Sequence, residues 1–476
     1  MSAFNRLLAT VAPQAALRRE TAQIKFKALM NYDGASRGRR TAGWKATGTD
    51  ADAAAFGSRA RLRQISRDMI RNRPYAARGQ SVIVNNVVGL GVVPSIECED
   101  EKDKLKLEQL VIDHLNSKHL DAHGSLNIRG IQRVGMNEVF ESGEILLRRR
   151  KRNTKLDTRL KLPFQVEMLE ADHLDDSVAT NGGNEVREGV EYDKWGNVLA
   201  YWLFDQHPGS ASRIRDYTSR RVDASDIIHV RRLDRAGQTR GVPWLAPAIL
   251  TLGELADYQE AQNLKQKISA LLAGVIESEG GDGQAKFDQE DVPGLEDLAP
   301  GALVQAKPGQ KVNWSDPPTV DGYDQVMRQG IAAAAMALGI TYESLAGDLS
   351  RVNFASGKMG RMEMDRNVEA WQQDIMVDQL CDGIARWCRE ALPLVKPVTE
   401  AQWEIKWTAQ RRPLIDPSRE IKAMTAQIEA GLISRQRVMR QLGHDPAVIR
   451  KERAEDAAAD TADNIKPTET TETKNA

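Results

Sequence analysis

The chain has 476 residues, of which 41% are hydrophobic and 28% are charged, a composition typical of a folded protein with more than one structural unit. The sequence contains no run of about eighteen apolar residues, which excludes a membrane-spanning helix. The net charge of -1 conceals a basic first quarter and an acidic tail, so partners must be inferred from local charge. Cys98, Cys381 and Cys388 form no CxxC pair, and we predict core or free thiols, no metal site and no cofactor.

The first 56 residues are rich in Ala, Gly, Arg and Thr without sustained periodicity, which predicts a basic N-terminal arm. Ser58 then precedes an amphipathic helix whose apolar stripe contains Leu62, Ile65 and Met69. Arginines recur every fourth residue along this helix, at Arg59, Arg63, Arg67 and Arg71. Two interpretations remain open: a solvated face, or a ridge that contacts phosphate or another protein surface.

Residues 57–241 alternate between helical and strand patterns, which predicts an α+β region. Pro74 suits the first turn of a second helix, and the run VNNVVGLGVVP leads from that helix into a strand. This run is no dinucleotide-binding loop, because Pro94 stands where that motif needs its third glycine. Helical spacing over 104–116 and 128–142 is followed by strands in GEILLRRRK and LPFQVEMLE and by a hairpin around Trp195.

The run EADHLDDS is the one cluster that could bind a divalent ion, through Asp172, His173, Asp175 and Asp176. An acidic turn at a strand end is the commoner meaning of such a run, and no supporting ligands can be identified elsewhere. We therefore predict no metal site. His229, at the end of another predicted strand, is interpreted as structural.

A long helix is predicted over 242–276, with Pro243 and Pro247 near its start, where proline is tolerated. Such a helix would span roughly 45 Å. A small module with paired short strands follows over 277–323, and a second helix over 324–340. The chain is thus expected to leave the body of the protein along one helix and return along another.

Residues 341–358 break the helical pattern and are predicted to form a loop. The loop is not a phosphate-binding P-loop, because Val352 and Met359 replace its glycine and its magnesium-binding Ser or Thr. A helix and a strand are predicted over 359–412, and two helices over 413–452 that begin after Asp416 and Ser434. The tail 453–476 has little apolar content and is predicted to be disordered.

No catalytic constellation is evident, since the sequence has no HExxH, no GxSxG and no convincing Cys/His pair. The two C-terminal helices could form a helix-turn-helix DNA reader, with Arg435, Arg437 and Arg440 on the second helix. Helix pairs that start and stop at such residues are common in all-α modules, so the pattern is weak evidence for a DNA reader.

Taken together, these segments resemble the phage portal proteins of the lambda type from Ala12 to Glu455. The motifs that carry the resemblance are RRTAGW, SRDMIRNRPYAARGQSVIVNNVVGLGVVP, GVEYDKWGNVLAYWLFDQHP, DIIHVRRLDRAGQTRGVPWLAPAIL, PGQKVNW, LGITYESLAGDLSRVNFASGK and IDPSREI with AGLISRQRVMRQLGHDP. One departure lies in the predicted loop, where NFASGK stands in place of the family's Asn-Tyr-Ser-Ser and a following basic residue.

The resemblance implies a non-enzymatic ring, usually of twelve subunits, at one capsid vertex of the virion around a channel for double-stranded DNA. Its subunits have an α+β wing (57–241 and 359–412), a helical stem (242–276 and 324–340), a small α/β clip (277–323) and a helical crown (413–452). Implied partners are the large terminase subunit, a head-completion adaptor and the major capsid or scaffold protein, met in the host cytoplasm during assembly.

In this scheme the loop 341–358 corresponds to the family's tunnel loop, which approaches the DNA. The implied contacts are Arg351 and Lys358 to phosphates, with Ser350, Asn353 and Ser356 as neutral polar contacts. The arginine ridge could supply one of the two faces that a ring interface needs. A terminase-like ATPase or nuclease and a helix-turn-helix regulator remain the alternative functions.

Overall fold

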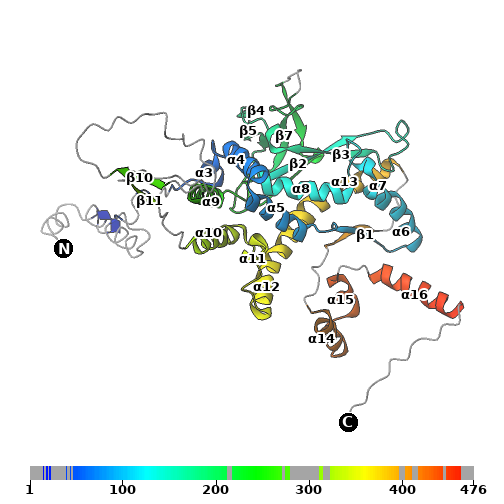
Figure 1. Cartoon of the computed structure of the whole chain (residues 1–476). Helices are drawn as coiled ribbons and strands as arrows, with labels where there is room; N and C mark the ends of the chain where they lie inside the picture. The colour runs from blue at the N-terminus through cyan, green and yellow to red at the C-terminus, as the bar shows by residue number, and fades with distance from the viewer. Residues whose placement is uncertain are drawn as a thin grey trace, which may run out of the picture. The chain divides into compact units, whose positions relative to one another are not determined.

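The computed structural model describes residues 47–211, 217–270, 274–278, 310–314, 322–395, 402–409, 416–442 and 446–462, together with Gln14, Arg18, Arg19, Thr21, Ala22, Arg39 and Gly43. The chain divides into two compact units, Met1–Ala54 and Ala55–Ala476 (Figure 1). The predicted N-terminal arm, residues 1–56, has nearly the same bounds as the first unit, of which only a few short pieces are described. The remaining description concerns the second unit.

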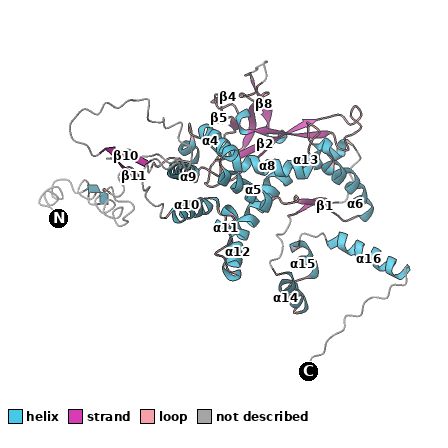
Figure 2. Cartoon of the chain, in the orientation of Figure 1, coloured by secondary structure: helices cyan, strands magenta, loops and turns pink. Residues whose placement is uncertain are grey.

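Helices make up most of the described chain, and strands are concentrated in its middle (Figure 2). The α-helices are α3 (Ala51–Ala55), α4 (Arg59–Asn72), α5 (Pro74–Val87), α6 (Glu101–Leu107), α7 (Asp113–Asn116), α8 (Ile128–Ser142), α9 (Ile249–Ala270), α10 (Tyr323–Leu338), α11 (Tyr342–Ala346), α12 (Phe354–Trp371), α13 (Asp382–Ala391), α14 (Pro417–Glu429), α15 (Arg435–Gln441) and α16 (Pro446–Ala462). A π-helical segment, Gln372–Cys381, joins α12 to α13.

The strands pair in four antiparallel sheets. They are β1 (Val93–Cys98), β2 (Glu144–Lys151), β3 (Phe164–Glu170), β4 (Thr180–Asn181), β5 (Asn184–Arg187), β6 (Val190–Tyr192), β7 (Val198–Phe204), β8 (Ser219–Asp223), β9 (Ile227–Arg231), β10 (Gly274–Ser278), β11 (Gln310–Trp314) and β12 (Trp403–Thr408). The strand orders are β3-β2-β9, β4-β5-β6-β7-β8, β1-β12 and β10-β11. The predicted α+β class is thereby confirmed.

One large apolar core joins the helices to the three-stranded sheet. It contains the fully buried Trp244 and Trp387, together with Cys381 and Cys388. Burial raises the pKa of the Cys388 thiol to about 12, so these two cysteines are the core residues that the sequence predicts. A smaller core, including Leu146, joins the three-stranded sheet to the five-stranded sheet.

Several predicted elements are confirmed at or near their expected bounds. The predicted helix 128–142 is α8, which Asn127 caps by accepting a hydrogen bond from the Gly130 amide at 3.1 Å. The hairpin around Trp195 is formed by β6 and β7. The C-terminal helices begin where expected, since Asp416 caps α14 and the Ser434 hydroxyl accepts from the Arg437 amide at 3.1 Å.

The prediction of one helix over 242–276 is wrong at both ends. Before α9, the chain makes tight turns in which the Ala246 amide donates to Pro243 O at 3.0 Å and the Ala248 amide to Leu245 O at 2.7 Å. After α9, Gly274–Ser278 is strand β10, because this β-prone run pairs with β11 far along the sequence. The 22 residues of α9 span about 33 Å. Most of the predicted module 277–323 lies outside the described residues.

The prediction that residues 453–476 are disordered is wrong for 453–462, which continue helix α16. These residues carry little apolar surface but include Ala454, Ala457, Ala458 and Ala459. Alanine has the highest helix propensity of the residues, so a helix can form here without burial. Residues beyond Ala462 lie outside the described part of the chain.

The end of α8 fixes the path of the chain into α9. Gly143 ends α8 with φ +90°, and a Cβ at this position would lie 2.5 Å from the carbonyl carbon of Val242. The backbone of the segment that leads to α9 therefore packs directly on the backbone between α8 and β2. Only glycine allows both the conformation and this close approach.

Gly143→Ala is expected to lower the free energy of unfolding by more than about 3 kcal/mol, because it adds a backbone clash to a positive-φ cost of about 1–3 kcal/mol. Gly196→Ala is the matched control, since Gly196 has φ +87° and no atom within 4 Å of the added Cβ. Urea unfolding of both variants measures the difference. Equal losses of stability would contradict the close packing at Gly143.

Candidate functional site

The arginines of α4 do not form one exposed ridge. Arg59 and Arg63 are 3% and 7% exposed, Arg67 is half-buried and Arg71 is exposed. Arg59 forms an ion pair with Glu188, and Arg63 Nη2 lies 3.3 Å from Asp172 Oδ1. The predicted exposed ridge is therefore wrong for Arg59 and Arg63. No local pattern signals this burial, because Glu188 and Asp172 lie more than 100 residues away in the sequence from their arginine partners.

Glu144, the first residue of β2, is fully buried and accepts hydrogen bonds from three sides. Arg240 Nε donates at 2.8 Å, His229 Nε2 at 2.9 Å and the Gly241 amide at 2.7 Å. Arg63 Nη1 lies 3.9 Å from the same carboxylate. A buried carboxylate is stable only with such compensation, so Glu144 connects α4, β9 and the segment before α9.

Protonation states within this cluster follow from burial and charge. Burial acts to raise the pKa of Glu144, but Arg240 and His229 outweigh it and hold the pKa well below its ordinary value. Burial lowers the pKa of His229 to about 4, so the imidazole is neutral at pH 7 and its Nε2–H donates to Glu144. His229 is thus structural, as the sequence predicts.

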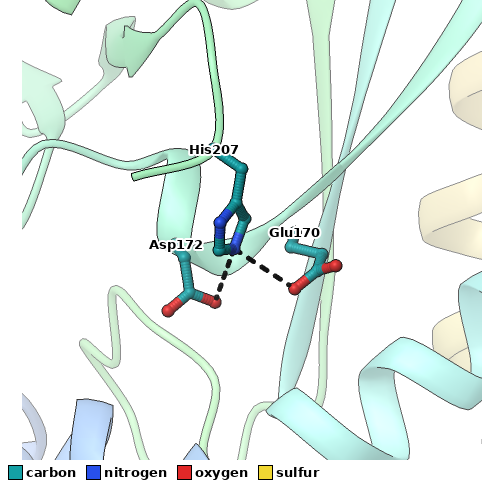
Figure 3. A group of neighbouring side chains, drawn as sticks. All are labelled: Glu170, Asp172 and His207. Carbon is teal, nitrogen blue, oxygen red and sulfur yellow. Dashed lines mark ion pairs between the residues drawn. The ribbon is translucent and has the colours of Figure 1, made fainter. Parts of the chain in front are cut away.

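A second polar cluster surrounds Arg67. Its Nη2 lies 2.7 Å from Glu170 Oε2, 2.8 Å from Asp172 Oδ2 and 4.0 Å from Glu138 Oε2. His207 Nε2 lies 3.5 Å from Glu170 and 3.9 Å from Asp172, between the two carboxylates (Figure 3). Burial acts to raise the pKa of Asp172, but Arg63 and Arg67 outweigh it and the pKa is lowered.

The four residues considered for a divalent ion do not converge. His173 Nδ1 bonds to Phe204 O at 2.9 Å, and Asp175 accepts from the Ser177 amide at 3.0 Å. Asp172 instead meets Glu170 and His207, whose ligand atoms lie within 4.8 Å of one another. The guanidinium of Arg67 pairs with the same carboxylate oxygens of Glu170 and Asp172 that an ion would use. Arg67 therefore already supplies positive charge to these carboxylates.

The predicted loop 341–358 is shorter in the structure and spans Gly347 to Asn353. Helix α11 forms before it, capped by Thr341, whose hydroxyl accepts from the Ser344 amide at 3.2 Å. Helix α12 begins at Phe354, five residues earlier than expected. Asn353 and Ser356 cause this early start, because their side chains form a reciprocal capping box.

The loop residues assigned to DNA contact fall into two groups. The Ser356 hydroxyl and the Asn353 side-chain oxygen are used at the start of α12. Ser350 and Arg351 are exposed and Lys358 is half-buried. Arg351 Nη2 lies 3.2 Å from Asp324 Oδ2 at the start of α10, so the loop contacts α10 through its arginine.

Residues 37–372 match the family model described as phage portal protein, lambda family. The chain belongs to this family. It is 24% identical to the probable portal protein of Halomonas phage phiHAP-1 over 434 residues, covering 86% of this chain and 82% of that one. It is 22% identical to the portal protein of Escherichia phage N15 over 452 residues, covering 85% of each.

The fold is similar to that of a chain in the solved neck of an empty GTA particle, with a TM-score of 0.50 and 16% identity over 80% of this chain and 94% of that one. This confirms the portal-type α+β fold. Family membership assigns a phage portal function at the capsid vertex, in preference to a packaging enzyme or a helix-turn-helix regulator. Among the described helices, none is both long and apolar enough to cross a membrane.

Arg63→Gln is expected to lower the free energy of unfolding by about 3 kcal/mol, because it removes one of the positive charges that compensate the buried Glu144 and the half-buried Asp172. Arg61→Gln, at an exposed position of the same helix, should change it by less than about 0.5 kcal/mol. Urea unfolding distinguishes the two. If both variants unfold like the unmodified chain, Arg63 is not the internal partner described above.

Glu138→Gln is expected to stabilise the chain at neutral and higher pH. Burial and the nearby Glu170 raise the pKa of Glu138 from 4.5 to about 7, so the folded chain binds an extra proton between these values. The free energy of unfolding therefore falls as the pH rises from 4.5 to about 7. Above that range the full cost of ionising the buried Glu138 carboxyl is present. The variant should be more stable at pH 8 by on the order of 2 kcal/mol.

At pH 5 the same variant should show little difference from the unmodified chain, because Glu138 is then largely protonated. Unfolding free energies at several pH values measure the trend, with Glu363→Gln, at an exposed position of α12, as the control. A stability difference that stays constant from pH 5 to pH 8 would rule out this titration.

Proposed function

We propose that copies of this chain form a closed ring of about twelve subunits, through whose centre double-stranded DNA enters and leaves the capsid. The observation that carries this proposal is the family match, because residues 37–372 include α4 to α8, both α9 and α10, the loop and α12. The neck structure with the similar fold was computed with C6 symmetry, which is compatible with such a ring.

The loop between α11 and α12, with the start of α12, is the proposed DNA contact. Arg351 and Asp324 have side chains that are 63% and 76% exposed, so their ion pair is weak and a phosphate can replace the carboxylate. Ser350 and Lys358 supply further polar contacts. Asn353 and Ser356 act indirectly, by fixing where the loop ends and α12 begins.

Such contacts bind the phosphate backbone of the DNA and do not recognise its bases. The chain then acts without catalysis, as the docking site for the large terminase subunit and later for a head-completion adaptor, with the major capsid or scaffold protein around it. In this scheme α9 and α10 form the stem, residues 277–323 the clip, and residues 413–452, which include α14, α15 and the start of α16, the crown. Of the four α4 arginines that were predicted to form a surface ridge, only Arg71 remains in this proposal as a surface contact.

Arg351→Gln is expected to leave ring assembly unchanged and to lower the yield of DNA-filled heads severalfold, since a phosphate contact is lost in every subunit. The test is complementation of a phage that lacks its own copy of this chain, followed by counting filled and empty heads.

Arg366→Gln is the matched control, because Arg366 forms an exposed pair with Glu363 at 3.4 Å, with side chains 75% and 76% exposed. This control should give a normal yield of filled heads. Normal yields from both variants would remove Arg351 from the proposed DNA contact.

A further inference from the structure

Helices α15 and α16 enclose a cleft of about 440 Å³. Its apolar lining is supplied by Met439, Pro446 and Ile449, and three arginines lie around it, Arg435, Arg450 and Arg453. None of the described residues that line the cleft carries a carboxylate. The cleft therefore presents apolar surface and positive charge together, which suits an acidic protein segment with small apolar side chains.

The three arginines have no ion pair among the described residues. In the same helix as Arg450 and Arg453, the Nζ of Lys451 lies 4.0 Å from Glu455 Oε1, four residues further along. All three arginines are exposed. Their charge is thus available to a partner.

The C-terminal half of α16 has the opposite character. Glu455, Asp456 and Asp460 lie there with Ala457, Ala458 and Ala459 between them, and these side chains are all exposed. At 3.6 residues per turn, the three carboxylates fall within less than half of the helix circumference. This acidic end combines negative charge with small apolar side chains. Its charge is opposite to that of the arginines around the cleft.

The charges of α16 are arranged against the helix dipole. The dipole favours acidic residues in the first turn and basic residues in the last turn, and α16 has neither. Instead, its arginines lie in the first half of the helix and Asp460 lies in the last turn. The order of charge is therefore not explained by the stability of the isolated helix.

Glu455 and Asp456 directly follow the cleft-lining Ala454, but a subunit cannot bring its own Asp460 into its own cleft. Arg453 and Asp460 lie seven residues apart on one helix, which separates their backbones by roughly 10 Å along the axis. A helix with a basic cleft at one end and an acidic surface at the other has the head-to-tail polarity that a ring requires, because a heterologous interface joins two different surfaces.

We propose that the cleft between α15 and α16 receives the acidic end of α16 from a second copy of this chain. This inference rests on the proposed ring and names one of its subunit contacts. Arg435, Arg450 and Arg453 of one subunit pair with Glu455, Asp456 and Asp460 of the next, while alanines of the incoming helix pack on Met439 and Ile449.

A cysteine pair tests this contact directly. In the variant with Arg453→Cys and Asp460→Cys, a disulfide within one subunit is excluded, because its Cα atoms must lie within about 7 Å. Oxidation should therefore link successive subunits and give a ladder of multimers on a non-reducing gel. Each single-cysteine variant is a control and should give dimers at most. Rings that remain unlinked in the double variant would overturn the proposal.

Charge reversal provides an independent test. Arg450→Glu with Arg453→Glu, and separately Asp456→Arg with Asp460→Arg, should each lower the salt concentration at which rings dissociate by about twofold, because salt screens exposed charges. Combining all four substitutions should restore the original value.

Mass photometry across a salt series measures dissociation, and circular dichroism checks that α16 remains helical. Rings whose salt resistance is the same in all variants would overturn this contact alone. A four-substitution variant weaker than either pair would do the same. If the unmodified chain forms no ring at any salt concentration, the proposed function fails together with this inference.

Discussion

The buried carboxylate of Glu144 is the constraint on which the rest of the described structure depends. It begins β2 directly after the glycine that ends α8, and it accepts from Arg240, His229 and the Gly241 amide. Removing one partner from such a cluster leaves the buried charge less fully compensated. The carboxylate therefore holds the sheet, α4 and the start of the α9 segment in one arrangement.

This arrangement directs most of the positive charge of α4 inward. Arg63 and Arg67 neutralise the carboxylates of Glu144, Glu170 and Asp172, and little of the helix remains for binding DNA or a neighbour. Apart from the exposed Arg61 and Arg71, charged surface for assembly must then come from other elements. The C-terminal helices fit this requirement, because α14 has no buried residue and α16 separates its charges along its length.

Much of the fold could be predicted from the sequence, because the information is local. Capping by Asn127 and the hydrophobic spacing of α8 define that helix, and short β-prone runs define β2 and β3. Local patterns failed where a distant partner decides the outcome. Gly274–Ser278 resembles the end of a helix until β11 is available to pair with it, and the α4 arginines resemble a solvated face until Glu144 and Asp172 are placed beside them.

The loop that carries the proposed DNA contact was predictable in position but not in its exact bounds. A break in helical pattern located the loop, yet Asn353 and Ser356 were assigned to it because such residues favour turns. In the structure the same polar groups start α12, since a side chain that suits a turn also suits a helix cap. Which of the loop's polar atoms can meet a ligand depends on these hydrogen bonds, and composition alone does not specify them.

The most direct test of the central claim, that this chain is a ring-forming portal subunit, is single-particle imaging of the purified chain. The account predicts closed rings with a central hole wide enough for a DNA duplex, present over a range of salt concentrations. Monomers or open filaments under all of these conditions would contradict it.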